Sequence, residues 1–198
     1  MQSELVLSTA GIVLVMVGLP GPNNLMLMAS GVNFGVRRSI PHITGIVLGC
    51  QALLVAMTVG LGQLLVIYPR AELALKVLSV LFLSYVAVLL WRAGGRTAQR
   101  RAEARPMSVW EAAVFQWVNP KAWMMCLTLV AALGQTALSD GSLLWVALTF
   151  ALLSTPLLVF WNVGGQMLNA WLQKGTRLRW FNRVMALLLL ASMGLIVA

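Results

Sequence analysis

Long apolar runs alternate with short polar stretches along the whole chain, and this pattern predicts six membrane-spanning helices. The runs cover about residues 5–30, 40–67, 73–91, 109–133, 143–168 and 181–197. Each run is near the length of roughly 20 residues that a helix needs to cross the hydrocarbon core of a bilayer. We therefore expect an all-α, polytopic integral membrane protein, with residues 1–198 forming one transmembrane domain surrounded by lipid.

The first apolar run is interrupted by the stretch Pro20-Gly21-Pro22-Asn23-Asn24. A proline inside a helix lacks an N–H and clashes with the carbonyl four residues earlier, so the helix must break here. Backbone groups cannot stay unpaired in lipid, and the break must therefore be buried in protein or line a wet cavity. Pro22 is well placed to begin a second half-helix.

The fourth run repeats this arrangement with Asn119-Pro120-Lys121. The N-terminus of a half-helix offers free N–H donors and partial positive charge, both of which favour an anion. A lysine at this depth costs about 2.5–3.5 kcal/mol on insertion scales, which indicates a use. We expect the two half-helix starts to meet near the midplane and bind a substrate carboxylate, while the carbonyls of Gly18 and Gln116 accept from its ammonium. Alternatively, the breaks are structural kinks, and Lys121 pairs with nearby carbonyls.

The two broken runs also suggest an internal duplication. Residues 22–27 of the first run correspond to residues 120–125 of the fourth. Three spans in each half require the halves to insert in opposite orientations, which is typical of transporters with inverted repeats. The predicted halves cover about residues 1–92 and 109–198, with a basic cytoplasmic loop at about 93–108 between them.

The basic residues predict the orientation in the membrane. The chain has 14 Lys and Arg against 5 Asp and Glu, for a net charge of +9. Eleven of these basic residues lie in or beside the first, third and fifth connections (two, five and four), and two lie near the second. The positive-inside rule then places these three connections in the cytoplasm and both termini outside. Nucleic-acid binding is not expected, since it needs one basic patch with interleaved aromatic residues.

Composition supports a membrane protein and argues against a metal site. Hydrophobic residues make up 60% of the chain and charged residues 10%, whereas about a quarter of the residues in soluble domains are charged. Cys50 and Cys126 lie inside apolar runs without metal-like spacing, so neither a metal nor another cofactor is expected. The single histidine, His42, is interpreted as a solvated residue at the cytoplasmic edge. Oligomeric state is left open.

Five further residues are candidates for helix packing or for lining a path. Gly45 and Gly49 have the small-xxx-small spacing that lets helices pack closely, and we expect this contact to guide movement between the halves. Gln51, Gln116 and Asn162 are polar residues within spans. Each is expected either to line a path or to form an interhelical hydrogen bond.

The chain resembles the LysE/RhtB family of amino-acid exporters. The resemblance covers nearly the whole length and rests on the six-span pattern, Pro-Gly-Pro-Asn at 20–23, the glycines at 45–49, and Asn-Pro-Lys at 119–121. It implies efflux of amino acids or close derivatives across the bacterial inner membrane, in exchange for protons. The first motif and Asn162 are most similar to the branch that exports cysteine and O-acetylserine.

One departure from the family bears on proton coupling. Some members carry an acidic residue in the second or fifth span, where this chain has Cys50 and Thr155-Pro156. Coupling then depends on Lys121, Glu111 or His42, and a basic amino acid is a poor candidate substrate.

The expected function is a secondary exporter of small neutral amino acids, of the class of cysteine, O-acetylserine, homoserine and threonine, working by proton antiport. One alternative is a six-span thiol oxidoreductase that uses Cys50 and Cys126. It would need a cysteine within disulfide reach beside each helix break, and the first run has none. Another alternative is a non-transporting membrane subunit.

Overall fold

The structure is a computed structural model that describes residues 2–61, 63, 67–93, 105–133, 141–172 and 174–197. These residues form eight α-helices and one short π-helical segment, with no β-strand among them. The prediction of an all-α chain is therefore confirmed for the described part. Most of the predicted basic loop at 93–108, namely residues 94–104, lies outside the described residues.

Both predicted helix breaks are confirmed. The first apolar run forms α1 (Gln2–Gly18) and α2 (Pro22–Phe34), which are bent by 58° at the break between them. The fourth run forms α7 (Val109–Val118) and α8 (Pro120–Leu133), with Asn119 between them in an extended conformation. In each pair, a proline is the first residue of the second half-helix, as its missing N–H favours.

The remaining runs form α3 (Val36–Ala56), the π-helical segment η1 (Met57–Leu61), α5 (Pro69–Ala93), α9 (Ser142–Leu172) and α10 (Arg177–Val197). Helix α3 begins four residues earlier than predicted. Gly35, with a φ of 78°, turns the chain sharply out of α2, a conformation that favours glycine. The Gln166 side chain of α9 then accepts the Val36 N–H at 2.6 Å and caps the new helix.

Three helical segments are long and apolar enough to cross a membrane: Val36–Leu61, Leu73–Arg92 and Ser142–Leu172. The bent pair of α1 and α2 would raise the number to four. These counts of membrane-spanning helices depend on the length and composition of the helices within the described residues. They support a membrane protein, while the predicted number of six spans stays a prediction.

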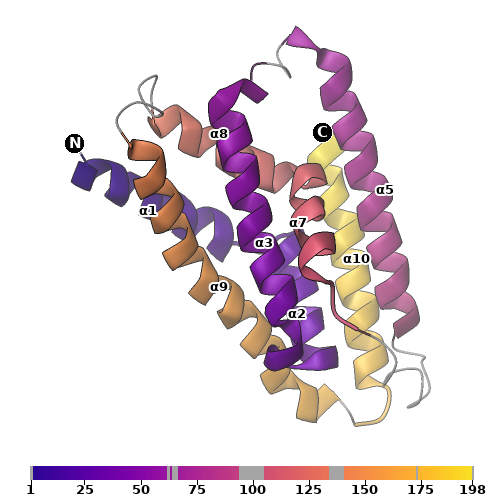
Figure 1. The fold of residues 1–198 in the computed structure, drawn as a ribbon. Coiled ribbons are helices and arrows are strands. Elements are labelled where there is room, and N and C mark those ends of the chain that lie inside the picture. The colour runs from indigo at the N-terminus through magenta and orange to yellow at the C-terminus, as the bar shows by residue number, and fades with distance from the viewer. Residues whose placement is uncertain are drawn as a thin grey trace.

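Figure 1 shows how the helices are arranged. Helices α5 and α10 lie side by side at one edge, α1 and α9 pack at the other, and α3 and α7 lie between them. Helices α1 and α8 both run obliquely to α3, α5 and α10. Helices α2, α5 and α9 end at the lower end of the view, and both chain termini lie toward the opposite end.

The backbones of α2 and α9 approach very closely. A Cβ atom added to Gly31 would lie 2.0 Å from the carbonyl oxygen of Asn162, and one added to Gly165 would lie 2.1 Å from that of Met28. No side chain larger than hydrogen fits at either position without separating the helices. Small residues at such contacts are typical of helix packing in membranes.

The exterior is apolar and the interior contains polar groups, as expected for a protein in lipid. Several large apolar side chains are 70% to 77% exposed: Leu7, Leu152, Phe160 and Met167. Several polar side chains are almost fully buried: Thr9, Ser79, Ser154, Asn162 and Asn182. Polar groups in a membrane favour partners within the bundle, and Ser79 has its partner at the second helix break.

Candidate functional site

At the first break, Asn24 caps the carbonyl end of α1. Its side-chain amide donates to the carbonyl of Val17 at 2.7 Å and to that of Leu19 at 2.8 Å. Asn24 is 3% exposed. This predicted binding residue therefore satisfies carbonyls in the last turn of α1, where the helix ends, and it holds the bend between α1 and α2.

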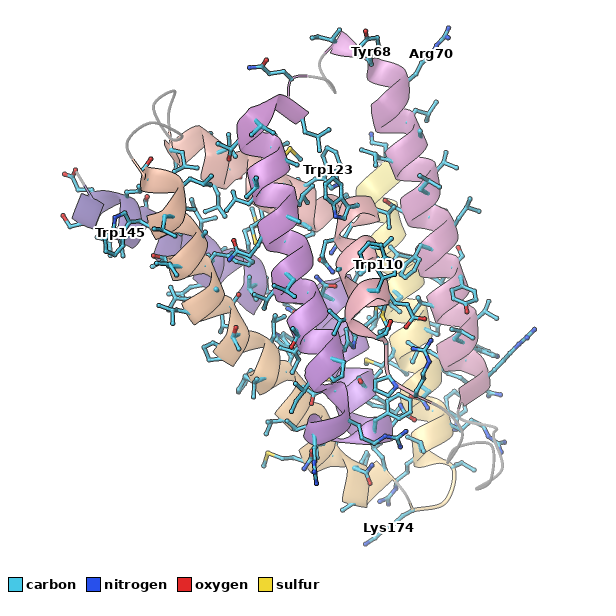
Figure 2. The ribbon with its side chains drawn as sticks, viewed as in Figure 1. Tyr68, Arg70, Trp110, Trp123, Trp145 and Lys174 are labelled. Carbon is cyan, nitrogen blue, oxygen red and sulfur yellow. The ribbon has the colours of Figure 1, made fainter. Side chains whose placement is uncertain are left out.

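At the second break, side chains satisfy the carbonyls at the end of α7. The indole N–H of Trp123 donates to the Trp117 carbonyl at 2.9 Å, and the Ser79 hydroxyl of α5 donates to the Val118 carbonyl. The labelled Trp123 lies between the end of the molecule that carries Tyr68 and the end that carries Lys174 (Figure 2). The break thus sits within the bundle, away from both ends.

The two breaks face each other, and Lys121 joins them. Its ammonium group donates to the carbonyl of Leu19 at 2.7 Å and to that of Pro20 at 3.3 Å. Its side chain crosses Gly21 so closely that an added Cβ there would lie 2.9 Å from Lys121 Cδ and Nζ. A cation is unfavourable at the start of α8 but favourable at the carbonyl end of α1, which carries partial negative charge.

Gln116 connects the same two breaks through hydrogen bonds. The Asn23 amide donates to Gln116 Oε1 at 2.8 Å, and Gln116 Nε2 donates back to Asn23 Oδ1 at 3.3 Å. Asn119 Nδ2 lies 3.5 Å from the same Oε1 atom, and the Cys50 thiol lies 3.6 Å from it. The main-chain carbonyl of Gln116, which the sequence suggested for a substrate ammonium, accepts the Asn119 N–H at 3.3 Å.

A small cavity of about 30 Å³ lies between the breaks. It is lined by groups from both breaks, including Gly21, Asn23, Asn119 and Lys121, and by Ser154 of α9. This volume matches about one water molecule, so no amino acid fits in this conformation. The Ser154 hydroxyl is fully buried and has no hydrogen-bond partner within the described part of the chain. It is available to a ligand once the site widens.

Two predicted polar residues form interhelical bonds instead of lining this cavity. The Gln51 amide donates to the Ala147 carbonyl at 2.7 Å, which joins α3 to α9. The Asn162 amide donates to the Leu27 carbonyl at 2.8 Å, which joins α9 to α2. Both bonds hold α9 in place beside the breaks.

Gly45 and Gly49 lie where α3 crosses α7. A Cβ atom added to Gly45 would lie 2.3 Å from the Val109 carbonyl oxygen, and one added to Gly49 would lie 2.6 Å from that of Ala113. This close contact brings α3 against the face of α7 that carries Gln116. The glycines therefore position the Cys50 thiol next to the Gln116 amide.

The cavity wall also contains two side chains with a thiol or hydroxyl group that were not predicted as site residues, Cys50 and Ser154. The sequence pattern around Ser154 could have identified it as a site residue. It lies four residues after Phe150 and eight before Asn162, and all three are buried on one face of α9. The pattern of apolar and polar residues at helical spacing identifies such a face, and a serine on it is a candidate for the site.

The interpretation of His42 as a solvated residue is wrong. The early start of α3 at Val36 places His42 well inside that helix, where it is only 2% exposed. Its side chain lines a second, larger cavity, whose other lining residues come mainly from α2 and α5. The predicted helix start at about residue 40 had placed His42 in the first, solvated turn, whereas the helix begins at Val36.

Comparison with known proteins identifies a family and two kinds of relative. The LysE type translocator family matches residues 13–197. The chain is 31% identical over 184 residues to a cysteine/O-acetylserine efflux protein of Escherichia coli strain K12, covering 86% of each chain. It is 28% identical over 178 residues to an uncharacterized membrane protein of Pseudomonas aeruginosa, covering 85% of this chain and 82% of the relative. No solved structure gives a significant match.

Proposed function

The chain belongs to the LysE type translocator family, and we propose that it is a six-span secondary exporter of small neutral amino acids or their derivatives. Its substrates are of the class of cysteine, O-acetylserine, homoserine and threonine, and they move out of the cytoplasm across the bacterial inner membrane in exchange for protons. The relatives named as cysteine/O-acetylserine efflux proteins support this class. Membership of a translocator family makes the protein a transporter and not a thiol oxidoreductase.

The observation that carries this proposal is the Lys121 ammonium bound to the Leu19 and Pro20 carbonyls across the two breaks. A primary ammonium is also one half of an amino-acid zwitterion. When a substrate enters, its carboxylate attracts the Lys121 ammonium, and its own ammonium takes over the carbonyls. The site thereby exchanges an internal ion–dipole contact for a bound zwitterion without leaving either charge unpaired in the membrane.

The surrounding groups complete the recognition of the carboxylate. Pro22 and Pro120 begin half-helices whose N-termini carry partial positive charge. The Asn23 amide and the Ser154 hydroxyl supply neutral donors from α2 and α9. Because the cavity measures only about 30 Å³, binding requires the breaks to move apart, and this movement is the substrate-dependent step of transport.

The order of the elements supports two inverted halves. The first half consists of the broken pair α1–α2 followed by α3 and α5, and the second consists of the broken pair α7–α8 followed by α9 and α10. In inverted-repeat transporters, broken helices of this kind meet at the repeat interface and bind the substrate there. The orientation has both termini outside, since the basic connections belong in the cytoplasm.

The test is survival of cells exposed to toxic levels of cysteine. The wild-type chain should protect them, and Lys121→Ala and Asn23→Ala should not, at equal membrane abundance. Protection by both variants would show that the midplane site is wrong. A wild-type chain that neither protects cells nor moves labelled cysteine in liposomes would instead be a non-transporting subunit.

A further inference from the structure

A second cavity, of about 360 Å³, opens between α2, α3, α5 and the segment that leads into α7. It is about twelve times the volume of the cavity at the helix breaks. Its walls are mostly apolar, with Met26, Phe82 and Val86 among them, and its polar groups include His42 and Glu111. A concave, largely apolar cavity with a few convergent polar groups is the usual form of a small-molecule site.

His42 is the buried polar group of this cavity. The side chain is 2% exposed, and neither Nδ1 nor Nε2 has a hydrogen-bond partner anywhere in the described residues. A neutral imidazole has one N–H donor and one acceptor nitrogen, and leaving both unpaired in a protein interior is costly. A ligand with a hydrogen-bonding group in this cavity would give the ring a partner.

An ion pair forms the rim of the same cavity. Arg105 donates from Nη1 to Glu111 Oε2 at 2.6 Å and from Nη2 to Oε1 at 2.7 Å, and the Ser108 N–H donates to Oε2 at 2.8 Å. The hydrogen bond to Glu111 raises the pKa of Arg105, so the guanidinium stays charged. The two charges cancel, and the rim therefore attracts a dipolar molecule without selecting a net charge.

We propose that this cavity is a second amino-acid site, which loads neutral amino acids from the cytoplasm before they reach the helix breaks. The N–H of the His42 ring donates to the carboxylate of the zwitterion, and the ammonium of the same molecule lies toward the Glu111 carboxylate at the rim. The side chain of the ligand lies against Phe82 and Val86. This inference rests on the proposed export function, because it assigns the cavity to the same substrate.

The experiment measures uptake of radiolabelled cysteine by inside-out membrane vesicles that contain the full chain. Their outer surface is the cytoplasmic face, so uptake reports export. His42→Leu should raise KM about tenfold with little change in maximal rate, because a loading site contributes binding and not the later steps. His42→Gln, which keeps a donor and an acceptor, should stay within about threefold of the wild-type KM.

A second pair of variants tests the cavity independently of His42. Val86→Trp fills part of the cavity and should also raise KM. Val88→Trp makes the same change on the same helix at a side chain that is 47% exposed, and it should behave as wild type.

The outcomes separate the two proposals. Unchanged KM in both His42→Leu and Val86→Trp would overturn the loading site while leaving the export function in place. A reduced maximal rate at unchanged KM would likewise overturn it, because the residues would then have only a structural role. If His42→Leu does not accumulate in the membrane, the comparison of Val86→Trp with Val88→Trp decides. Absence of uptake by abundant wild-type protein would overturn the export function itself.

Discussion

Gly21 leaves room for the side chain that joins the two helix breaks. An alanine there would place its Cβ 2.9 Å from Cδ and Nζ of Lys121, and the flexible end of the lysine can move aside. Gly21→Ala should therefore fold normally but displace the ammonium from the Leu19 and Pro20 carbonyls. We expect cysteine uptake to fall about tenfold, as for the loss of one charge-assisted hydrogen bond.

The matched control is Gly18→Ala. A Cβ atom added at Gly18 meets no heavy atom within 4 Å, although this residue lies only three positions earlier. Vesicles with Gly18→Ala should take up cysteine at the wild-type rate. Equal rates for Gly18→Ala and Gly21→Ala would show that the lysine contact is not needed for transport.

Ser154 gives a prediction in which stability and activity respond differently. Its hydroxyl is buried without a partner among the described residues, so Ser154→Ala should leave thermal stability unchanged or raise it slightly. If the hydroxyl binds substrate, KM for cysteine should rise several-fold. Thr155→Ala is the control, since Thr155 donates to the Ala151 carbonyl of its own helix and is exposed. A stable Ser154→Ala protein with wild-type KM would remove Ser154 from the site.

At the scale of single residues, the sequence identified residues that are uncommon within a membrane span, but it did not identify the atoms that they contact. Lys121 stood out because a charge inside an apolar run has a cost. Asn24 could not be assigned, because its partners, the Val17 and Leu19 carbonyls, become available only once the bend exists. His42 was placed wrongly because its burial depends on α3 beginning at Val36.

At the scale of elements, the contact between α2 and α9 is the most sensitive to added volume. Gly165→Ala would bring a methyl group to 2.1 Å from the Met28 carbonyl oxygen, and backbone cannot move aside as a side chain can. The helices must separate, and we expect a loss of about 1–3 kcal/mol in the free energy of unfolding. Thermal unfolding in detergent, followed by size-exclusion chromatography, measures this loss.

The neighbouring residue provides the control for this prediction. A Cβ atom added to Gly164 meets no heavy atom within 4 Å, so Gly164→Ala should match the wild type or slightly exceed it. If both alanine variants unfold at the same temperature, the close approach of α2 and α9 is not a determinant of stability.

Helix boundaries were predicted correctly where they depend on residues nearby in the sequence. They were predicted less well where they depend on contacts with other helices. The breaks at residues 19–21 and 119 follow from proline chemistry within the chain. The start of α3 does not, because it depends on the turn at Gly35 and on Gln166 of α9, which lies 130 residues away. The Ser79 hydroxyl that caps Val118 likewise comes from a different helix.

At the scale of the whole molecule, the distribution of basic residues among the connections predicts the orientation in the membrane. Tyr68 and Lys174 lie at opposite ends of the bundle (Figure 2). In intact cells, a membrane-impermeant maleimide should label Tyr68→Cys but not Lys174→Cys, and permeabilised cells should show both. The native Cys50 and Cys126 are buried, which keeps the background low. The reverse pattern would contradict the positive-inside assignment.

The membrane class and the family could be recognised from sequence because they depend on composition and on short motifs at fixed positions. The sequence could not show that the two breaks face each other. This arrangement requires Lys121 of one half to contact the Leu19 carbonyl of the other half, 102 positions away. That contact is the basis of the proposed site.

The central claim is that this contact between the breaks recognises the substrate, and Lys121 tests it most directly. The measurement is the initial rate of radiolabelled cysteine uptake by inside-out vesicles with wild-type chain or Lys121→Ala at equal abundance. We predict a loss of about tenfold to a hundredfold, because a charged partner of the zwitterion is removed. A Lys121→Ala rate within about twofold of wild type would contradict the account.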